Sequence, residues 1–375
     1  MSGCTTNNAR FTLRGKFGVG LGFSFSSVEQ WSFVRDQSFG KTTKIELTLR
    51  ISKTFPMPGF RLLAILLLFC TVQGLRAQQL SLFTQYRENS TIINPAAVES
   101  DYLAYGLNVS FGASYRNQWV GISGSPTTQV VRGSYLADGM SGVALMAGGH
   151  IINDVTGPTG LTGFYGRIAG ILTDDPSYGG FSIGLSAGYV QYRVNGSEIV
   201  FREGTDNIGT TDQSQMYPDV GLGLFFYKAA GGRFVDNYFY AGVSVPQVFG
   251  LDLTFQNDDG EFVTKRVQHI YGQVGFYKFF DNNSFLEPSV WFKYAPNVPT
   301  NIDINLRYQL PSTLWVGAGV STAQNVHLEA GLVLGENIGL DNTLRFGYGY
   351  DYSFSSFGPT AGNTHEINVT YSFGR

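Results

Sequence analysis

The final stretch of the chain alternates without a break between apolar and polar residues. From His365 to Phe373, one set of alternate positions reads His, Ile, Val, Tyr, Phe, and the other reads Glu, Asn, Thr, Ser. Successive side chains of a β-strand point to opposite faces, so this segment has one apolar face and one polar face. The segment 343–352 repeats the pattern, with Leu, Phe and Tyr on one face and Thr, Arg, Gly and Asp on the other. Such strands fit a closed barrel with lipid outside and water inside.

Composition supports a barrel and argues against a helical membrane protein. The 375 residues include 30 Phe, 21 Tyr and 48 Gly, while charged residues make up only 14%, against roughly a quarter in soluble domains. One apolar run, Leu62 to Phe69, resembles a helix, but it is far shorter than the roughly 20 residues that a spanning helix needs. Lipid offers the backbone no hydrogen-bond partners, so a membrane protein without spanning helices must be a barrel.

The strand-like segments recur at regular spacing, and turn residues separate them. Joints such as Asp138-Gly139 and Asp281-Asn282-Asn283 carry residues that tolerate tight hairpins. The longer polar stretches 203–215 and 256–265 suit extracellular loops. The sequence therefore predicts an all-β fold, a transmembrane antiparallel β-barrel of about fourteen strands. They are expected near 103–118, 126–137, 141–153, 159–172, 180–194, 216–228, 236–246, 266–280, 284–295, 301–309, 312–321, 325–335, 342–353 and 363–374.

The first part of the chain has the pattern of an export signal. Arg61 precedes the apolar run, and the small residue Ala77 follows it, which describes a secretory signal peptide. Because signal peptides are N-terminal, we expect Met57 to be the true start and residues 1–56 to be an upstream artefact, with a real extension as the alternative. Residues 57–77 would be the signal peptide, cleaved between Ala77 and Gln78. Residues 78–100 would form an N-terminal arm, for which the lumen is one place to fold, and residues 101–375 the barrel.

Cleavage at that point would change the charge and the cysteine content. Residues 78–375 carry 15 Lys+Arg and 25 Asp+Glu, a net charge of −10. This balance argues against a nucleic-acid partner, which needs basic surface. Cys4 and Cys70 both precede the expected cleavage site, so the mature chain would have no disulfide and no thiol chemistry.

The histidines give little support for catalysis. His150, His269, His327 and His365 have no second His or Cys at metal-ligand spacing, so neither a metal site nor a cofactor is expected. Some outer-membrane barrels are lipases with a Ser–His pair, and His365 beside Glu366 could be imagined in one. Serines occur throughout the chain, so none is singled out as a nucleophile for His365, and we predict that the protein is not an enzyme.

One polar cluster, from Tyr115 to Thr128, has two interpretations. Arg116 and Gln118 share one strand face, and Trp119 lies on the other, at a strand end that suits the membrane interface. An Arg facing the lumen needs an acidic partner, because an unpaired buried charge is costly. The cluster is then either a structural ion pair with an interface anchor, or a docking feature. Arg116, Gln118 and Asp154 are the candidates for lumen order or docking.

The order of motifs along the chain resembles the PorP/SprF family of the type IX secretion system. Asn94-Pro95-Ala96 resembles the family's NPAY opening, although Ala97 stands where the family has tyrosine. The most specific block runs from Tyr115-Arg116-Asn117-Gln118-Trp119 to Pro126-Thr127-Thr128. His365-Glu366-Ile367 closes the match near the C-terminus.

This resemblance implies a function in protein secretion. It implies a barrel in the Gram-negative outer membrane that helps to export or surface-anchor a large adhesin-like client, recognised through the client's C-terminal domain, in secretion or gliding motility. It also implies periplasmic and lipoprotein partners from the same apparatus, besides outer-membrane lipid. The alternative is an outer-membrane porin or hydrophobic-solute transporter, which the polar inner face supports.

Overall fold

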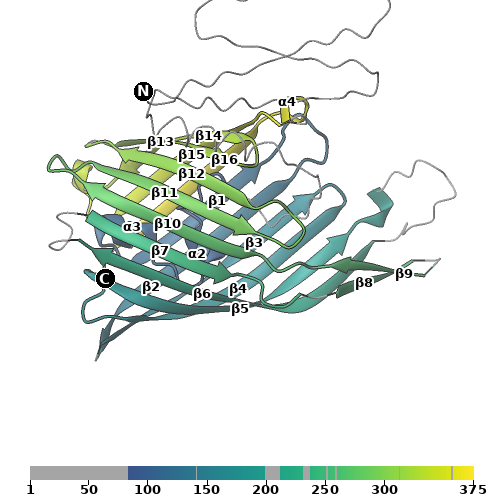
Figure 1. Ribbon diagram of the computed structural model, residues 1–375, viewed down its shortest axis with the longest axis horizontal. Coiled ribbons are helices and arrows are strands. Elements are labelled where there is room, and N and C mark those ends of the chain that lie inside the picture. Colours follow the sequence, from purple (N-terminus) through teal and green to yellow (C-terminus); the bar gives the residue numbers. More distant parts are fainter. Residues whose placement is uncertain are drawn as a thin grey trace, which may run out of the picture. The chain divides into compact units, whose positions relative to one another are not determined.

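The computed structural model describes residues 83–375 apart from 141, 199–211, 231–236, 251, 258–259, 312 and 356–357. The expected signal peptide, its cleavage site at Ala77 and Gln78, and residues 1–56 lie outside the described residues. The described chain is a closed antiparallel barrel of fourteen strands, in which β1 pairs with β16 (Figure 1). This confirms the predicted fold class.

The barrel strands follow one another around the wall in chain order. In that order they are β1 (Val109–Asn117), β2 (Thr127–Met140), β3 (Val143–Thr156), β4 (Thr159–Leu172), β5 (Gly179–Val194), β6 (Gln213–Ala229), β7 (Asn237–Val245), β10 (Ile270–Phe279), β11 (Phe285–Tyr294), β12 (Asn301–Gln309), β13 (Leu314–Ser321), β14 (Asn325–Leu334), β15 (Thr343–Ser353) and β16 (Thr364–Phe373). A separate hairpin, β8 (Asp252–Asn257) and β9 (Gly260–Lys265), lies between β7 and β10 in the chain. Short helices are α2 (Ser90–Ile93), α3 (Ser100–Tyr105) and α4 (Gly358–Ala361), with 3-10 turns at Gly196–Glu198 and Glu336–Ile338.

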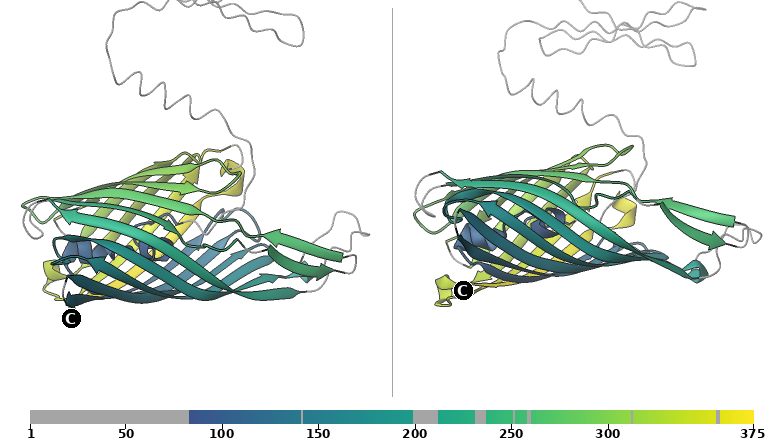
Figure 2. Two further views of the ribbon diagram at one scale, coloured as in Figure 1. Left: turned by 60° about the horizontal axis from the view of Figure 1, so that its bottom comes forward. Right: turned by 90° about the horizontal axis from the view of Figure 1, so that it is seen from below.

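The barrel has two different ends. At the turn end, where β1 begins and β16 ends, β2 and β3 are joined by residues 141–142, and β12 and β13 by 310–313. At the loop end, β1 and β2 are joined by residues 118–126, and residues 246–269, with the β8–β9 hairpin, join β7 to β10. Strands β2 to β6 have 14 to 17 residues, more than the roughly ten that a tilted strand needs to cross lipid. The wall is therefore longest there, and Figure 2 shows the hairpin projecting beside it.

On β15 and β16 the wall places apolar side chains outside and mainly polar side chains inside. On β16, Ile367 is 52% exposed and Tyr371 is also exposed, whereas Glu366 and Ser372 are fully buried. The same alternation occurs on β15, where Phe346 and Tyr348 point outward. A closed ring leaves no strand edge unpaired, and its apolar outer belt is compatible with hydrocarbon. None of the helices among the described residues is long and apolar enough to cross a membrane.

Two parts of the chain differ from the predicted strands. The first predicted strand, 103–118, contains the end of α3, and β1 begins only at Val109. Gly106 ends α3 in the left-handed conformation, at φ 73°, which glycine adopts without strain. The stretch 256–265, expected to be a loop, lies largely in the β8–β9 hairpin.

Candidate functional site

Residues 83–105, here called the plug, fill the lumen of the barrel. Most of their side chains are buried, including the polar Gln85, Glu88 and Asn89. The plug contacts inward-facing side chains of strands all around the ring, such as Arg116 on β1 and Arg307 on β12. Helices α2 and α3 lie inside the barrel in both views of Figure 2. One segment of the chain thus occupies the lumen.

The plug runs from the loop end of the lumen to the turn end. Near its start, the backbone N–H groups of Thr84 and Gln85 donate to the carboxylate of Glu366, which lies close to the loop end of β16, at 2.6 and 3.2 Å. Near its other end, Ser372 Oγ, at the turn end of β16, donates to Asp101 at 2.5 Å. The chain therefore passes through the barrel before it becomes β1.

In the loop half of the lumen, Arg116 is held by the wall and by the plug. Its guanidinium contacts Asp351 at 2.9 Å and Glu366 at 3.4 Å, and it donates to the hydroxyl of Thr84. All three charged groups are inward-facing side chains of β1, β15 and β16. Arg116, predicted for lumen order or docking, is therefore engaged in lumen contacts.

Two further cations of the loop half also have carboxylates on the barrel side. Lys293 on β11 pairs with Asp303 on the neighbouring β12, and it also contacts the hydroxyl of Tyr86 from the plug. Arg266, just before β10, pairs with Asp219 on β6 at 3.0 Å. Charges buried in this half are neutralised mainly within the wall, as a buried charge requires.

In the turn half, the plug supplies carboxylates to the cations of the wall. Glu88 accepts from Arg307 on β12 at 2.8 Å and from Arg345 on β15, and Arg132 on β2 lies 3.9 Å away. Arg345 also pairs with the carboxylate of Asp101. Side chains from three distant strands thus converge on one plug carboxylate. Charge-assisted, multiply bonded pairs of this kind are the strong ones.

Arg132 and Arg167 complete this cluster. Arg132 pairs with Glu99 of the plug at 3.4 Å and donates to Thr370 on β16 at 3.0 Å. Arg167 on β4 donates to the backbone carbonyls of Pro95 and Ala97 at 3.1 and 3.0 Å. We call Arg132, Arg167, Arg307 and Arg345 the arginine ring, because they approach the plug from four strands.

The Asn94-Pro95 motif lies very close to the wall. Asn94 Oδ1 accepts from the N–H of Ala96 at 2.9 Å, and its amide donates to the carbonyl of Leu224 at 3.1 Å. Gly184 and Gly223 are register partners on β5 and β6. A Cβ atom at Gly223 would lie 2.0 Å from Asn94 Oδ1, and one at Gly184 would lie 2.4 Å from the backbone N of Ala96. Only glycine allows the turn to approach the wall this closely.

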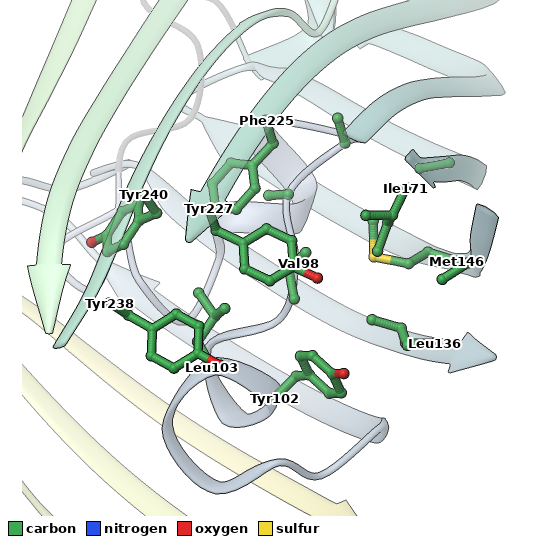
Figure 3. Close-up of a cluster of buried hydrophobic side chains, with 14 of the residues drawn as sticks. Val98, Tyr102, Leu103, Leu136, Met146, Ile171, Phe225, Tyr227, Tyr238 and Tyr240 are labelled. Carbon is green, nitrogen blue, oxygen red and sulfur yellow. The ribbon is translucent and has the colours of Figure 1, made fainter. Parts of the chain in front are cut away.

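An apolar cluster anchors the turn end of the plug. Val98, Tyr102 and Leu103 pack against inward side chains of β2, β3, β4, β6 and β7, which Figure 3 shows gathered around α3. Tyr227 and Tyr238 place their rings in this cluster, and their hydroxyls donate to the carbonyls of Pro176 and Ser177. Buried tyrosines of this kind contribute apolar area while keeping a hydrogen-bond partner.

The residues after β1 form a clamped loop at the loop end. The N–H of Gln118 donates to the carbonyl of Pro126 at 2.8 Å, and Trp119 adopts φ 58°. Gln118 and Trp119 therefore lie beyond the strand. Thr127 and Thr128 begin β2, and Thr128 Oγ1 donates to Asp154 at 2.7 Å. Asp154, a candidate for lumen order or docking, lies on β3, two residues before that strand ends.

The tip of this loop is held between its two neighbours. The N–H of Val120 donates to the carbonyl of Asn363 beside β16 at 3.0 Å, and the N–H of Gly157 donates to the carbonyl of Gly124 at 2.8 Å. Val120 and Ile122 are nevertheless 47% and 37% exposed. We call residues 119–125 the clamped loop. It presents two apolar side chains on a fixed backbone.

The histidines hold structural positions. His365 shares a short hydrogen bond of 2.6 Å with the hydroxyl of Tyr348, His327 contacts Asn305, and His150 stacks on Tyr165. Glu366, next to His365, points the other way, into the lumen. Among the described residues, no group of three or more His, Cys, Asp or Glu side chains is placed to hold a metal ion.

Sequence reasoning missed the arginine ring and its plug carboxylates. Arg132, Arg167, Arg307 and Arg345 each stand at a polar position of an alternating strand, which is the signal that could have found them. Their partners could not be found in this way, because Glu88 lies 219 residues from Arg307 and 257 from Arg345.

Several solved structures of other proteins are similar to the chain over much of its length. The toluene transporter TodX of Pseudomonas putida is 10% identical, with a TM-score of 0.46, covering 76% of this chain and 94% of that one. A FadL homologue from Pseudomonas aeruginosa is 7% identical, with a TM-score of 0.45, covering 76% and 93%. CdiB from Acinetobacter baumannii is 9% identical, with a TM-score of 0.38, covering 71% and 60%. No curated protein matches the sequence.

The comparison with protein families gives a match over almost the whole barrel chain. The family described as type IX secretion system membrane protein PorP/SprF matches residues 75–371. That range includes the plug, the Asn94-Pro95 turn, the clamped loop and all but the last two residues of β16. The chain therefore belongs to the PorP/SprF family of type IX secretion system membrane proteins.

Proposed function

We propose that the protein is a non-enzymatic accessory barrel of the type IX secretion system in the outer membrane. Its loop end would bind a large, secreted, adhesin-like client and help to export it or attach it to the cell surface. The client's C-terminal domain would be the part that is recognised, and periplasmic and lipoprotein components of the apparatus would be the other partners. The family match carries this proposal.

The orientation follows from the connections between strands. Outer-membrane barrels have short turns on the periplasmic side and longer loops outside. The 118–126 and 246–269 connections both lie at the loop end, so that end would face the outside. The clamped loop then presents Val120 and Ile122 to the exterior on a backbone that needs no ordering before it binds.

The experiment is complementation of a deletion strain. Deleting the gene should leave the client inside the cell or release it to the medium, and the wild-type gene should restore display. Ile122→Asp should fail to restore it, because a carboxylate would stand in the apolar contact. Asn297→Asp, which adds the same charge to the exposed β11–β12 connection, is the matched control. Protease shaving of intact cells measures the displayed client, and unchanged display in the deletion strain would rule the function out.

The rival function, a porin or hydrophobic-solute transporter, is less well supported because the plug occupies the lumen. One void between plug and wall, beside Arg87 and Glu287, has a volume of about 20 Å³, which accommodates about one water molecule. Planar-bilayer recording of the purified protein separates the two functions. A steady open current would favour the porin, whereas the accessory barrel should be closed at rest.

A further inference from the structure

The two halves of the lumen neutralise their buried cations differently. In the loop half, wall carboxylates pair with Arg116, Lys293 and Arg266. In the turn half, the described contacts of Arg132 and Arg345 with carboxylates are all to the plug. Without the plug, the wall of the turn half would therefore carry excess positive charge. The excess positive charge of the turn half does not depend on the surface role proposed above.

The wall of the turn half does hold some negative charge. Glu329 on β14 pairs with Arg307 at 2.9 Å, and Glu287 on β11 pairs with Arg87 of the plug at 3.1 Å. These two wall carboxylates stand against the four cations of the arginine ring. The plug supplies Glu88, Glu99 and Asp101, together with Arg87, so that the assembled half is close to neutral. The plug is therefore the counter-charge of a cationic wall.

The arginine ring also binds the plug backbone in a way that does not depend on the plug's sequence. Arg167 donates to the backbone carbonyls of Pro95 and Ala97, the residues on either side of Ala96. Guanidinium groups bind carboxylates through a planar fork of donors, and they remain charged when buried. Carboxylate-binding and backbone-binding arginines together suit a peptide that carries acidic side chains.

From these contacts we infer that the turn half of the lumen is a binding site for acidic peptide segments. The plug occupies this site in the resting protein, and an acidic segment of a partner can replace it. The site consists of the arginine ring, and the ligand chemistry is that of Glu88, Glu99 and Asp101. A lumen from which the plug has moved passes anions in preference to cations.

The first test records single-channel currents from the full chain in planar bilayers. The variant Glu88→Gln/Glu99→Gln/Asp101→Asn removes the plug carboxylates and keeps the arginine ring. We expect it to open in bursts, with anions favoured over cations by roughly tenfold in a salt gradient, because a channel lined by one sign of charge concentrates the opposite ion. The matched control, Asp174→Asn/Glu198→Gln/Asp281→Asn, removes three exposed carboxylates outside the lumen and should stay closed like the wild type.

A disulfide shows whether the current passes through the lumen. Asn89 on the plug and Ser114 on β1 contact each other at 3.0 Å, and neither is charged. Asn89→Cys/Ser114→Cys, added to the triple variant, should keep the barrel closed when oxidised and let it open when reduced. Equal currents in the two states, or preferential passage of cations, would overturn the inference.

The second test measures competition directly and needs only a mild variant. Arg87 is the one trypsin site within the plug, and it is nearly buried in the barrel. In Glu99→Gln, hexaglutamate should raise trypsin cleavage after Arg87 several-fold, and hexalysine should not, with the released N-terminal peptide measured by mass spectrometry. Heat-modifiable migration on gels confirms that each variant is a folded barrel. If hexaglutamate leaves the cleavage of a folded Glu99→Gln barrel unchanged, acidic segments do not compete for the ring.

Discussion

The loop half and the turn half of the lumen are built from the same residue types but depend differently on the plug. The loop half pairs its buried cations with carboxylates of the barrel: Arg116 with Asp351, Lys293 with Asp303 and Arg266 with Asp219. In the turn half, Arg132 and Arg345 form ion pairs with carboxylates of the plug. The buried charges of the loop half are thus largely paired within the barrel, whereas those of the turn half are fully paired only when the plug is in place.

The dependence on the plug also affects how β1 and β16 pair to close the barrel. The seam between β1 and β16 carries Ser110, Ser114 and Ser372 on the inside, and these bond to one another or to Asn89 and Asp101 of the plug. A buried polar group without a partner costs about 1–3 kcal/mol. The seam is therefore best satisfied when the plug already lies inside, which favours closure of the strands around it.

The largest effect is expected from removing a cation of the turn half. Arg345 is 1% exposed and contacts both Glu88 and Asp101. Arg345→Gln should lower the free energy of unfolding by about 3–5 kcal/mol, because it leaves buried carboxylates without their main partner. Urea unfolding of the barrel in lipid vesicles, followed by tryptophan fluorescence, measures this change.

The control for Arg345→Gln is Arg375→Gln, at the exposed C-terminus. It removes the same charge and should change the unfolding free energy by less than about 0.5 kcal/mol. In addition, trypsin should cleave after Arg87 in Arg345→Gln, since that variant releases the plug. Equal stability of the two variants would mean that the plug does not depend on the arginine ring.

A smaller and more local effect is expected in the loop half. Glu366→Ala removes the acceptor for the N–H groups of Thr84 and Gln85, but Arg116 keeps Asp351. We expect a loss of about 2 kcal/mol in unfolding free energy. Arg87 should stay protected from trypsin, because the turn half still holds the plug. Cleavage after Arg87 as fast as in Arg345→Gln would remove the distinction between the two halves.

The third effect concerns the close contact at the Asn94-Pro95 turn. Gly223→Ala places a Cβ atom against Asn94 and should destabilise the barrel by about 1–2 kcal/mol through overpacking. Gly166→Ala is the matched control, since its Cβ atom meets nothing within 4 Å. Thermal unfolding of both variants in the same detergent compares them. If both variants shift the unfolding temperature equally, the Asn94-Pro95 turn can move away from the wall.

The sequence was sufficient for the wall but not for what fills it. Strict alternation in 365–373 predicted which side chains of β16 point outward, because lipid and lumen impose opposite polarity on neighbouring positions. The chain before β1 has no such period, so the end of α3 was included in a predicted strand. The pairing of Glu88 with Arg307 and Arg345 depends on how distant strands meet across the lumen, which no local pattern contains.

The motifs illustrate the same limit at single residues. The sequence singled out Arg116 and required an acidic partner for it, and the structure supplies Asp351 and Glu366. It did not identify that partner, because the choice depends on strand register around the closed ring. Asn94 and Pro95 were recognised only as a family motif. The structure explains why these two residues occur there: the turn that they form approaches Gly184 and Gly223 closely, which is visible only once the plug is packed in the lumen.

The last prediction decides which half faces the outside and should leave stability almost unchanged. Residues 78–375 contain no cysteine, so a single introduced cysteine is the only one in that part of the chain. Ile122→Cys lies in the clamped loop, and Leu340→Cys lies at the turn end, between β14 and β15; both positions are exposed. On intact cells, a membrane-impermeant maleimide should label Ile122→Cys and leave Leu340→Cys unlabelled until the outer membrane is permeabilised. The opposite labelling pattern would mean that the barrel has the reverse orientation in the membrane. The arginine ring would then lie nearer the cell surface, and the clamped loop would lie in the periplasm, where no surface client could reach it.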